Sequence, residues 1–178
     1  VARASYPVQI KNQVIEAGVQ AYKGQFTLLS TTSGVGTATD KLYDDERIGA
    51  TFVLYPKPFG ILAEYNIGRG PEYDKLTNSI IESPLKGGFI TASYKLDFKG
   101  QTLIPFSRYQ YYDGGKKHEL DARSYEVKEL EIGAEWQPNK NFELVVMYTM
   151  SARRFEDAAN PTNFQRGNLL RIQAQVNF

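Results

Sequence analysis

The stretch ELEIGAEWQPNKNFELVVMYT, residues 129–149, contains two alternating segments on either side of a polar turn. In the first segment every second residue is apolar: Leu130, Ile132, Ala134 and Trp136. The residues between them are acidic or small: Glu129, Glu131, Gly133 and Glu135. A period of two predicts a β-strand with one apolar and one polar face. The pattern returns over 142–154, where only Val145 and Met147 interrupt the polar face, so a β-hairpin is expected around 138–141.

The same alternation recurs along the chain and predicts nine strands. They are expected at 2–11, 13–25, 45–55, 59–68, 87–98, 102–112, 125–137, 142–154 and 168–178. Strand 102–112 is the least regular, because the run Leu103 to Phe106 blurs its two faces. No helical periodicity of useful length is present.

The connections between these strands alternate in length. Short turns rich in Pro, Gly and Asn lie near residues 12, 57, 100 and 140. Long polar segments lie between them, at 26–44, 69–86, 113–124 and 155–167. Outer-membrane barrels have short turns at one end and long loops at the other. We therefore expect an all-β fold, an antiparallel up-and-down transmembrane β-barrel meander.

Composition limits the classes of function. The 178 residues are expected to form one domain, 1–178, and the net charge of +1 argues against nucleic acid as a partner. There is no Cys, and the one His, His118, lies in a predicted loop with no nucleophile nearby. We expect no enzyme, metal or cofactor. No apolar run reaches the roughly 20 residues of a membrane helix, but alternating membrane strands escape that test.

Aromatic residues support a membrane-spanning sheet. Five of them lie at the short-turn ends of their strands and on the apolar parity: Phe59, Phe98, Trp136, Phe142 and Phe178. We expect these to form an interfacial girdle, with Tyr65, Tyr109 and Tyr111 in the opposite one. Between the girdles, ten residues are expected to face lipid: Ile61, Ala63, Leu96, Ile132, Ala134, Leu144, Val146, Ile172, Ala174 and Val176. The alternative is a soluble, lipocalin-like barrel, in which the same apolar residues would form the core.

In the membrane interpretation the polar parity faces the lumen. The basic residues there are Arg3, Arg47, Lys95, Arg108, Arg153 and Arg171. The acidic ones are Glu16, Glu64, Asp97, Glu129, Glu131, Glu135 and Glu143. The two signs nearly cancel, so this set contains no uncompensated ring of the kind that selects anions. Arg108 and Arg171 are the preferred anion ligands, because a guanidinium presents a planar fork of donors. The alternative for each charge is a salt bridge within the wall.

Two further motifs are candidates for contacts outside the wall. The motif GRGPEYD (68–74) opens the predicted loop 69–86, and its glycines and proline would let it fold into the pore. Arg69, Glu72 and Asp74 would then line a constriction, unless the loop lies on the surface. The run Asp44-Asp45-Glu46 would bridge a divalent ion to lipopolysaccharide, unless it is simply a solvated strand end.

Four stretches carry a resemblance to a known family: YNIGRGPEYD (65–74), RYQYYDGGKKHE (108–119), the hairpin 129–149 and LLRIQAQVNF (169–178). Their order and spacing resemble the phosphate-selective porin O and P family of Gram-negative outer membranes. The resemblance implies a homotrimeric, anion-preferring channel in the bacterial outer membrane. It also implies a barrel of the 16-to-18-strand class. A terminal aromatic such as Phe178 resembles the signal read by the barrel-assembly machinery.

Strand direction adds an independent expectation. Strands 2–11 and 168–178 both run toward the short turns, so nine strands cannot close antiparallel to one another. The chain is therefore expected to be the C-terminal portion of a larger barrel. Its expected function is passive diffusion of small anions, phosphate among them, or of polar solutes through the bilayer. A structural or partner-binding barrel, plugged by its own charge pairs, is the second alternative.

Overall fold

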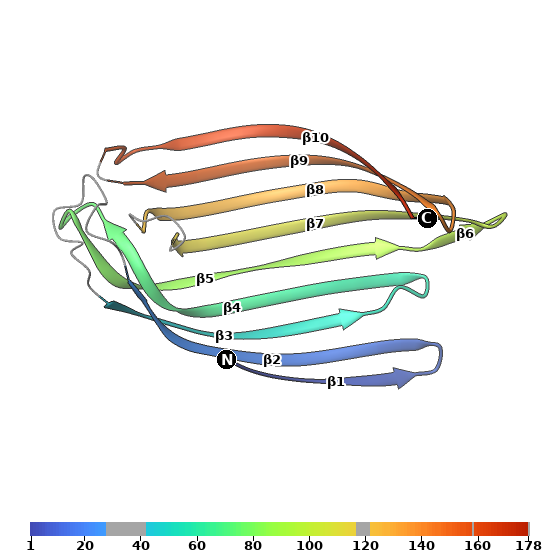
Figure 1. Ribbon diagram of the computed structural model, residues 1–178, viewed down its shortest axis with the longest axis horizontal. Helices are drawn as coiled ribbons and strands as arrows, with labels where there is room; N and C mark the ends of the chain where they lie inside the picture. The colour runs from blue at the N-terminus through green and yellow to red at the C-terminus, as the bar shows by residue number, and fades with distance from the viewer. Residues whose placement is uncertain (28–41, 117–121, 158, 178) are drawn as a thin grey trace.

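The computed structural model describes residues 1–27, 42–116, 122–157 and 159–177. The strands are β1 (Ala2–Ile10), β2 (Gln13–Thr27), β3 (Leu42–Leu54), β4 (Phe59–Asp74), β5 (Ser79–Tyr94), β6 (Leu96–Phe98), β7 (Gln101–Gly115), β8 (Ser124–Asn139), β9 (Phe142–Glu156) and β10 (Phe164–Val176). They form one antiparallel sheet whose order follows the chain, with β6 paired to β7 beyond the end of β5 (Figure 1). The predicted up-and-down meander is confirmed. Within the described ranges, no helix is long and apolar enough to cross a membrane.

The four short turns lie where the sequence predicts them. They join β1 to β2, β3 to β4, β6 to β7 and β8 to β9 at one end of the sheet (Figure 1). Between β6 and β7, Lys99 and Gly100 both have positive φ, 48° and 78°. Two positive φ angles define the type I′ turn, whose twist matches that of the strands it joins. The tight connections therefore follow from local turn chemistry.

At the other end of the sheet, the predicted strand limits are partly wrong. The segment 69–86 is not a loop, because β4 and β5 stay paired from Arg69↔Pro84 to Asp74↔Ser79. Its glycines and prolines suggested a loop, yet both prolines lie where their strand has a free edge. The β3–β4 pairing ends at Arg69, and β5 pairs with β7 only from Lys86 onward. A strand edge tolerates a residue without an N–H.

Other strand limits differ by a few residues. The predicted strand 87–98 is divided, since β5 ends at Tyr94 and β6 begins at Leu96. The predicted long segments at 26–44, 113–124 and 155–167 are shortened by strands that extend into them. Residues 28–41 and 117–121 of the first two, with His118, lie outside the described residues.

The register separates the residues onto two faces. Directly paired residues share a face. The mainly apolar face can be followed across the whole sheet along one row of paired residues: Val8, Ile15, Leu54, Ile61, Ala92, Ser107, Ile132, Tyr148 and Leu170. On this face Ile132 is 52% exposed and Ile172 is 65% exposed. On the opposite face Glu129 is only 9% exposed. Apolar side chains turned outward and charged ones turned inward fit a sheet whose outer solvent is lipid.

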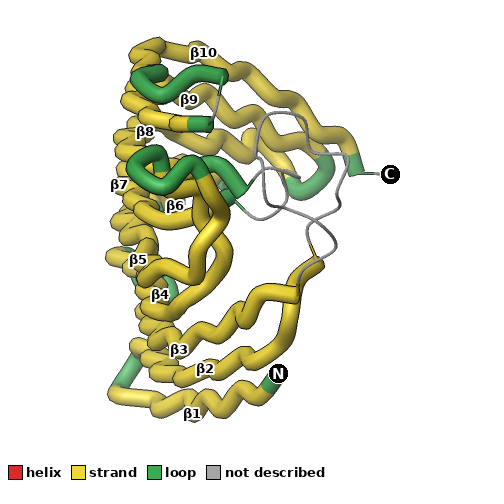
Figure 2. Tube along the Cα trace, turned by 90° about the vertical axis from the view of Figure 1, so that its left-hand side faces the viewer, coloured by secondary structure: helices red, strands yellow, loops and turns green. Residues whose placement is uncertain are grey.

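The distal part of the β4–β5 hairpin, residues 70–85, lies beyond the last pairs with β3 and β7, leaves the sheet and folds over its concave side (Figure 2). We call it the folded hairpin. It passes the ends of β7 and β8, where Tyr73 N donates to Ala122 O at 2.8 Å and Ser124 Oγ donates to Glu72 Oε1 at 2.6 Å. Its tip reaches β9, where Lys75 Nζ lies 3.1 Å from Glu156 Oε1. Beneath it lies a small buried cluster: Tyr43, Tyr73, Ile80 and Ala122, with Phe26 at its edge.

Candidate functional site: the concave wall

The charged residues predicted to face the lumen share one face of the sheet. Register places Glu64, Arg108, Glu129, Glu131 and Arg153 on this polar face, near the middle of the sheet. The same parity holds for seven others: Arg3, Glu16, Arg47, Asp97, Glu135, Glu143 and Arg171. Lys95 lies between β5 and β6, next to Asp97. This face is the concave one, because its Asp45 is completely buried next to Gly70 of the folded hairpin. The structure thus brings the predicted set onto one continuous wall.

Glu129 is the centre of the strongest polar network on this wall. Its Oε1 accepts hydrogen bonds from Arg153 Nη2 at 2.6 Å and Ser151 Oγ at 2.8 Å. Its Oε2 accepts from Gln110 Nε2 at 3.1 Å. Residues on β7, β8 and β9 supply these groups, and cross-strand register makes them neighbours. The charge-assisted pair and the further donors compensate the cost of desolvating the Glu129 carboxylate. Arg153 is therefore used in an ion pair within the wall.

Arg108 has a different environment, although it lies directly opposite Glu131 in the register. Its Nη2 donates to Gln110 Oε1 at 3.0 Å, and its guanidinium carbon lies 4.4 Å from the centre of the Phe89 ring. Its Nε is buried with no hydrogen-bond partner. The wall salt bridge considered as an alternative is not formed among the described residues. A guanidinium has five N–H donors, so Arg108 retains donors for a ligand.

Four other predicted residues are engaged in local contacts. Lys95 Nζ lies 3.2 Å from Asp97 Oδ2, and Arg47 Nε lies 3.2 Å from Asp45 Oδ1. Glu64 Oε1 accepts from Asn66 Nδ2 at 2.7 Å, and Gln20 continues this chain by donating to Asn66 Oδ1 at 3.1 Å. Two amides and a carboxylate therefore form a chain of hydrogen bonds between β2 and β4.

Apolar groups on the concave wall were not predicted as part of the site. Phe106, Ile104, Val145 and Met147 all have the polar-face parity, and the Phe106 ring lies over Gly133. The irregular alternation at 103–106 and at Val145 and Met147 was the available signal. These interruptions of the alternation correspond to an apolar patch beside Arg108.

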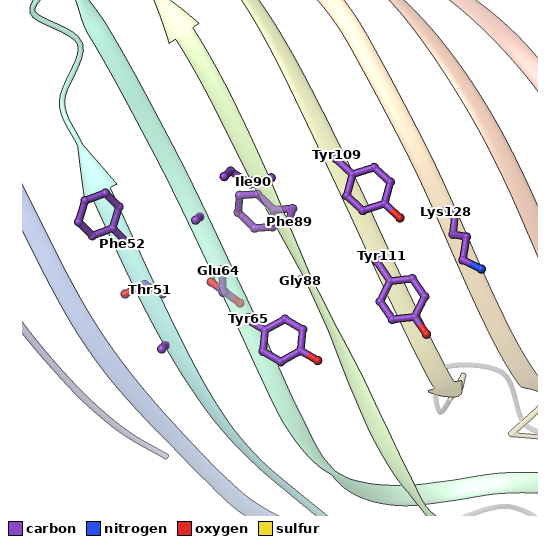
Figure 3. A pocket seen from close by; sticks show the side chains of 12 residues that line it. Thr51, Phe52, Glu64, Tyr65, Gly88, Phe89, Ile90, Tyr109, Tyr111 and Lys128 are labelled. Atoms are coloured by element: carbon purple, nitrogen blue, oxygen red, sulfur yellow. The ribbon is translucent and has the colours of Figure 1, made fainter.

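The convex face carries the predicted girdle residues. Phe59, Phe98, Trp136 and Phe142 all lie on this face at the short-turn end, and the first three are at least 38% exposed. Phe178 lies outside the described residues. Tyr65 and Tyr111 flank Gly88 in one cross-strand row over an open groove of about 720 Å³ (Figure 3). Their hydroxyl groups point toward the long-connection end, as expected for tyrosines at a membrane interface.

Two predicted motifs are placed differently from expectation. Arg69, Glu72 and Asp74 belong to β4 and not to a loop. Glu72 and Asp74 lie in the folded hairpin over the concave side, whereas Arg69 has the outward parity. The acidic run 44–46 is not a cluster, because Asp45 faces the concave side whereas Asp44 and Glu46 face outward. Alternation separates neighbouring residues in a strand. Among the described residues, no group of three or more potential ligand residues is placed to hold a metal ion.

These features define a transmembrane β-sheet of the outer-membrane porin class: an exposed apolar face with aromatic rows, and a charged concave wall. The family model for phosphate-selective porin O and P matches residues 8–178, and the chain belongs to that family. It is a family of channels and not of enzymes, and it implies a Gram-negative outer membrane. Searches of curated proteins and of solved structures found no significant match.

Proposed function

We propose that the concave face forms part of the wall of a water-filled channel for passive diffusion of small polar solutes, small anions such as phosphate among them. One observation carries this proposal: charged and amide side chains cover the concave face, whereas the convex face is apolar and exposed. A wall with buried ions is stable only where water or polar partners solvate it. Diffusion along such a wall requires no covalent step.

Anion preference, in this proposal, depends on Arg108. Arg153 is neutralised by Glu129 at 2.6 Å, and Lys95 by Asp97 at 3.2 Å. Arg108 forms no ion pair among the described residues and has a buried Nε without a partner. Its guanidinium is held against Phe89 and forms one hydrogen bond, from Nη2 to Gln110, so the remaining Nη donors are left for a phosphate or carboxylate. The neighbouring carboxylates keep the net field of the wall small, so selectivity should be moderate.

The test is the reversal potential of the full-length channel in a salt gradient across a planar bilayer. Arg108→Glu changes the wall charge by two units and should shift the reversal potential toward cations. The matched control is Arg166→Glu, the same charge change on the convex face of β10, which should leave it unmoved. An equal shift in both variants, or none in Arg108→Glu, would exclude Arg108 as the selectivity residue.

A plugged barrel is the second candidate, and the folded hairpin favours it. The hairpin covers the concave side and is tied to β9 through Lys75 and Glu156. If it closes the lumen, the full-length protein should show no stable conductance. Replacing residues 71–82 by a short turn should then open it. A channel that already conducts, and conducts more after this shortening, would identify the hairpin as a constriction.

We further propose that this sheet is one portion of a larger single-domain barrel of 16 to 18 strands. β1 and β10 run in the same direction, so they cannot close antiparallel to each other. A homotrimer and recognition of the C-terminal strand by the barrel-assembly machinery are parts of the same proposal. Detergent-corrected sedimentation of the full-length protein would test the trimer, and assembly of a Phe178→Ala variant would test the strand signal.

A further inference from the structure

A second groove lies on the convex face, away from the concave wall. It has a volume of about 880 Å³, and it runs over β2, β3, β4 and β5 at the long-connection end of the sheet. One cross-strand row in it is apolar except at its β5 end: Ala21, Ile48, Ile67 and Lys86. Ile48 is 65% exposed and Ile67 is 54% exposed. The floor of the groove is therefore suited to hydrocarbon.

The next row, two residues closer to the long connections, is charged. It consists of Lys23, Glu46 and Arg69, which are directly paired across β2, β3 and β4. Lys23 Nζ lies 3.5 Å from Glu46 Oε2, and Arg69 Nη2 lies 3.5 Å from Glu82 Oε2. Exposed ion pairs of this kind contribute about 0–1 kcal/mol, so a stronger anion can displace them. Lys86 forms no ion pair among the described residues.

The polarity of the convex face changes along the strands in one direction. Moving from the short turns to the long connections, the convex face changes from apolar residues to the tyrosine row (Figure 3), then to the row of Ile48, Ile67 and Lys86, and last to Lys23 and Arg69. In outer-membrane barrels the long connections are extracellular. A lipid of that leaflet has its acyl chains and its headgroup in the same order. The cations would thus meet the headgroup while its chains cover Ile48 and Ile67.

We propose that this groove binds one phosphate-bearing lipid of the outer leaflet, with Lys86, Arg69 and Lys23 contacting its phosphate groups. Charge complementarity and the direction of the polarity both favour this occupant. The acidic run 44–46 does not provide a cation bridge here, since Asp45 faces the opposite side and Glu46 is paired with Lys23. The site is separate from the channel, so the channel proposal does not depend on it.

The test uses the full-length protein in detergent, titrated with diphosphorylated lipid A and, separately, with fully dephosphorylated lipid A. Bound lipid is counted by native mass spectrometry. The variant combines Lys23→Gln, Arg69→Gln and Lys86→Gln. The control removes the same number of positive charges at the short-turn end: Lys57→Gln, Lys99→Gln and Lys140→Gln. Heat-modifiable migration on gels checks that both variants are folded.

We expect the groove variant to bind diphosphorylated lipid A at least tenfold more weakly than the unmodified protein and the control variant do. Dephosphorylated lipid A should bind weakly and equally to all three. The proposal is overturned if the groove variant keeps its affinity, if the control loses as much, or if the phosphates make no difference. It is also overturned if an Ile48→Cys variant forms disulfide-linked dimers in membranes at high yield, since a second copy would then occupy the groove.

Discussion

The sheet and the folded hairpin place the same kinds of side chain in opposite environments. In the sheet, isoleucines such as Ile132 and Ile172 face outward and Glu129 is buried on the inside. In the folded hairpin, Ile80 is 4% exposed and packs with Tyr43, Tyr73 and Ala122, while the Lys75 side chain is about half exposed. The difference is one of solvent, since the convex face of the sheet is suited to lipid and the hairpin lies on the opposite, polar side. Both regions obey the same preference for removing apolar surface from water.

The largest effect is expected from breaking the small core under the folded hairpin. Ile80→Ala should destabilise this region by about 2–5 kcal/mol, because it leaves a cavity in a buried cluster. Its neighbour Ile81 is 42% exposed, and Ile81→Ala should cost much less. Hydrogen exchange of amides in residues 71–82 measures the difference. Equal exchange in the two variants would show that the hairpin has no ordinary core.

The outward face of the sheet is tested by an adjacent pair of residues in β10. Ile172→Arg places a charge on the convex face and should cost about 2–4 kcal/mol if it lies near the midplane of the bilayer. Gln173→Arg places the same charge on the concave face and should be nearly neutral. Urea unfolding of the full-length protein in lipid vesicles gives both values. A concave-face arginine that costs as much would contradict the assignment of the faces.

On the polar wall, a substitution that removes one charge should lower the free energy of unfolding by a smaller amount. Glu129→Gln removes the ion pair with Arg153 while keeping an acceptor, and it should cost about 1–3 kcal/mol. Glu131→Gln is the control, because within the described part of the chain Glu131 accepts only from Thr149 Oγ1, at 3.5 Å. The same unfolding measurement compares the two variants. If Glu131→Gln is as costly, the network around Glu129 has no special role in the wall.

The smallest effect concerns the tip of the folded hairpin. A hydrogen bond from Thr77 Oγ1 at 2.8 Å, and then one from the Leu76 amide, lower the pKa of Asp74 below its ordinary value. The stabilisation is therefore complete above the ordinary carboxyl pKa and is lost as the pH falls through the lowered, folded-state pKa. Exchange of the amides of 75–78 should accelerate over that acid range. An Asp74→Asn variant that keeps the same pH dependence would exclude this carboxylate as its source.

The meander, the two faces and the turns are predictable from the order of the residues alone. These features follow from local rules, since alternation and residues such as Lys99-Gly100 act over only a few positions. The same rules also placed Glu129, Arg108 and Arg153 on one face. In a strand, parity alone decides on which side of the sheet a side chain lies.

The partner of each of these groups depends on contacts that exist only in the folded sheet. Glu129 pairs with Arg153 rather than Arg108, and its carboxylate receives donors from β7 and β9, two strands whose register the sequence does not reveal. Residues 69–86 look like a loop by composition, yet they form a hairpin whose prolines lie on free edges. Its packing on Tyr43 and Ala122 brings together residues up to 79 positions apart along the chain (122 − 43). Contacts of that range depend on the curvature of the whole sheet, and no local pattern encodes them.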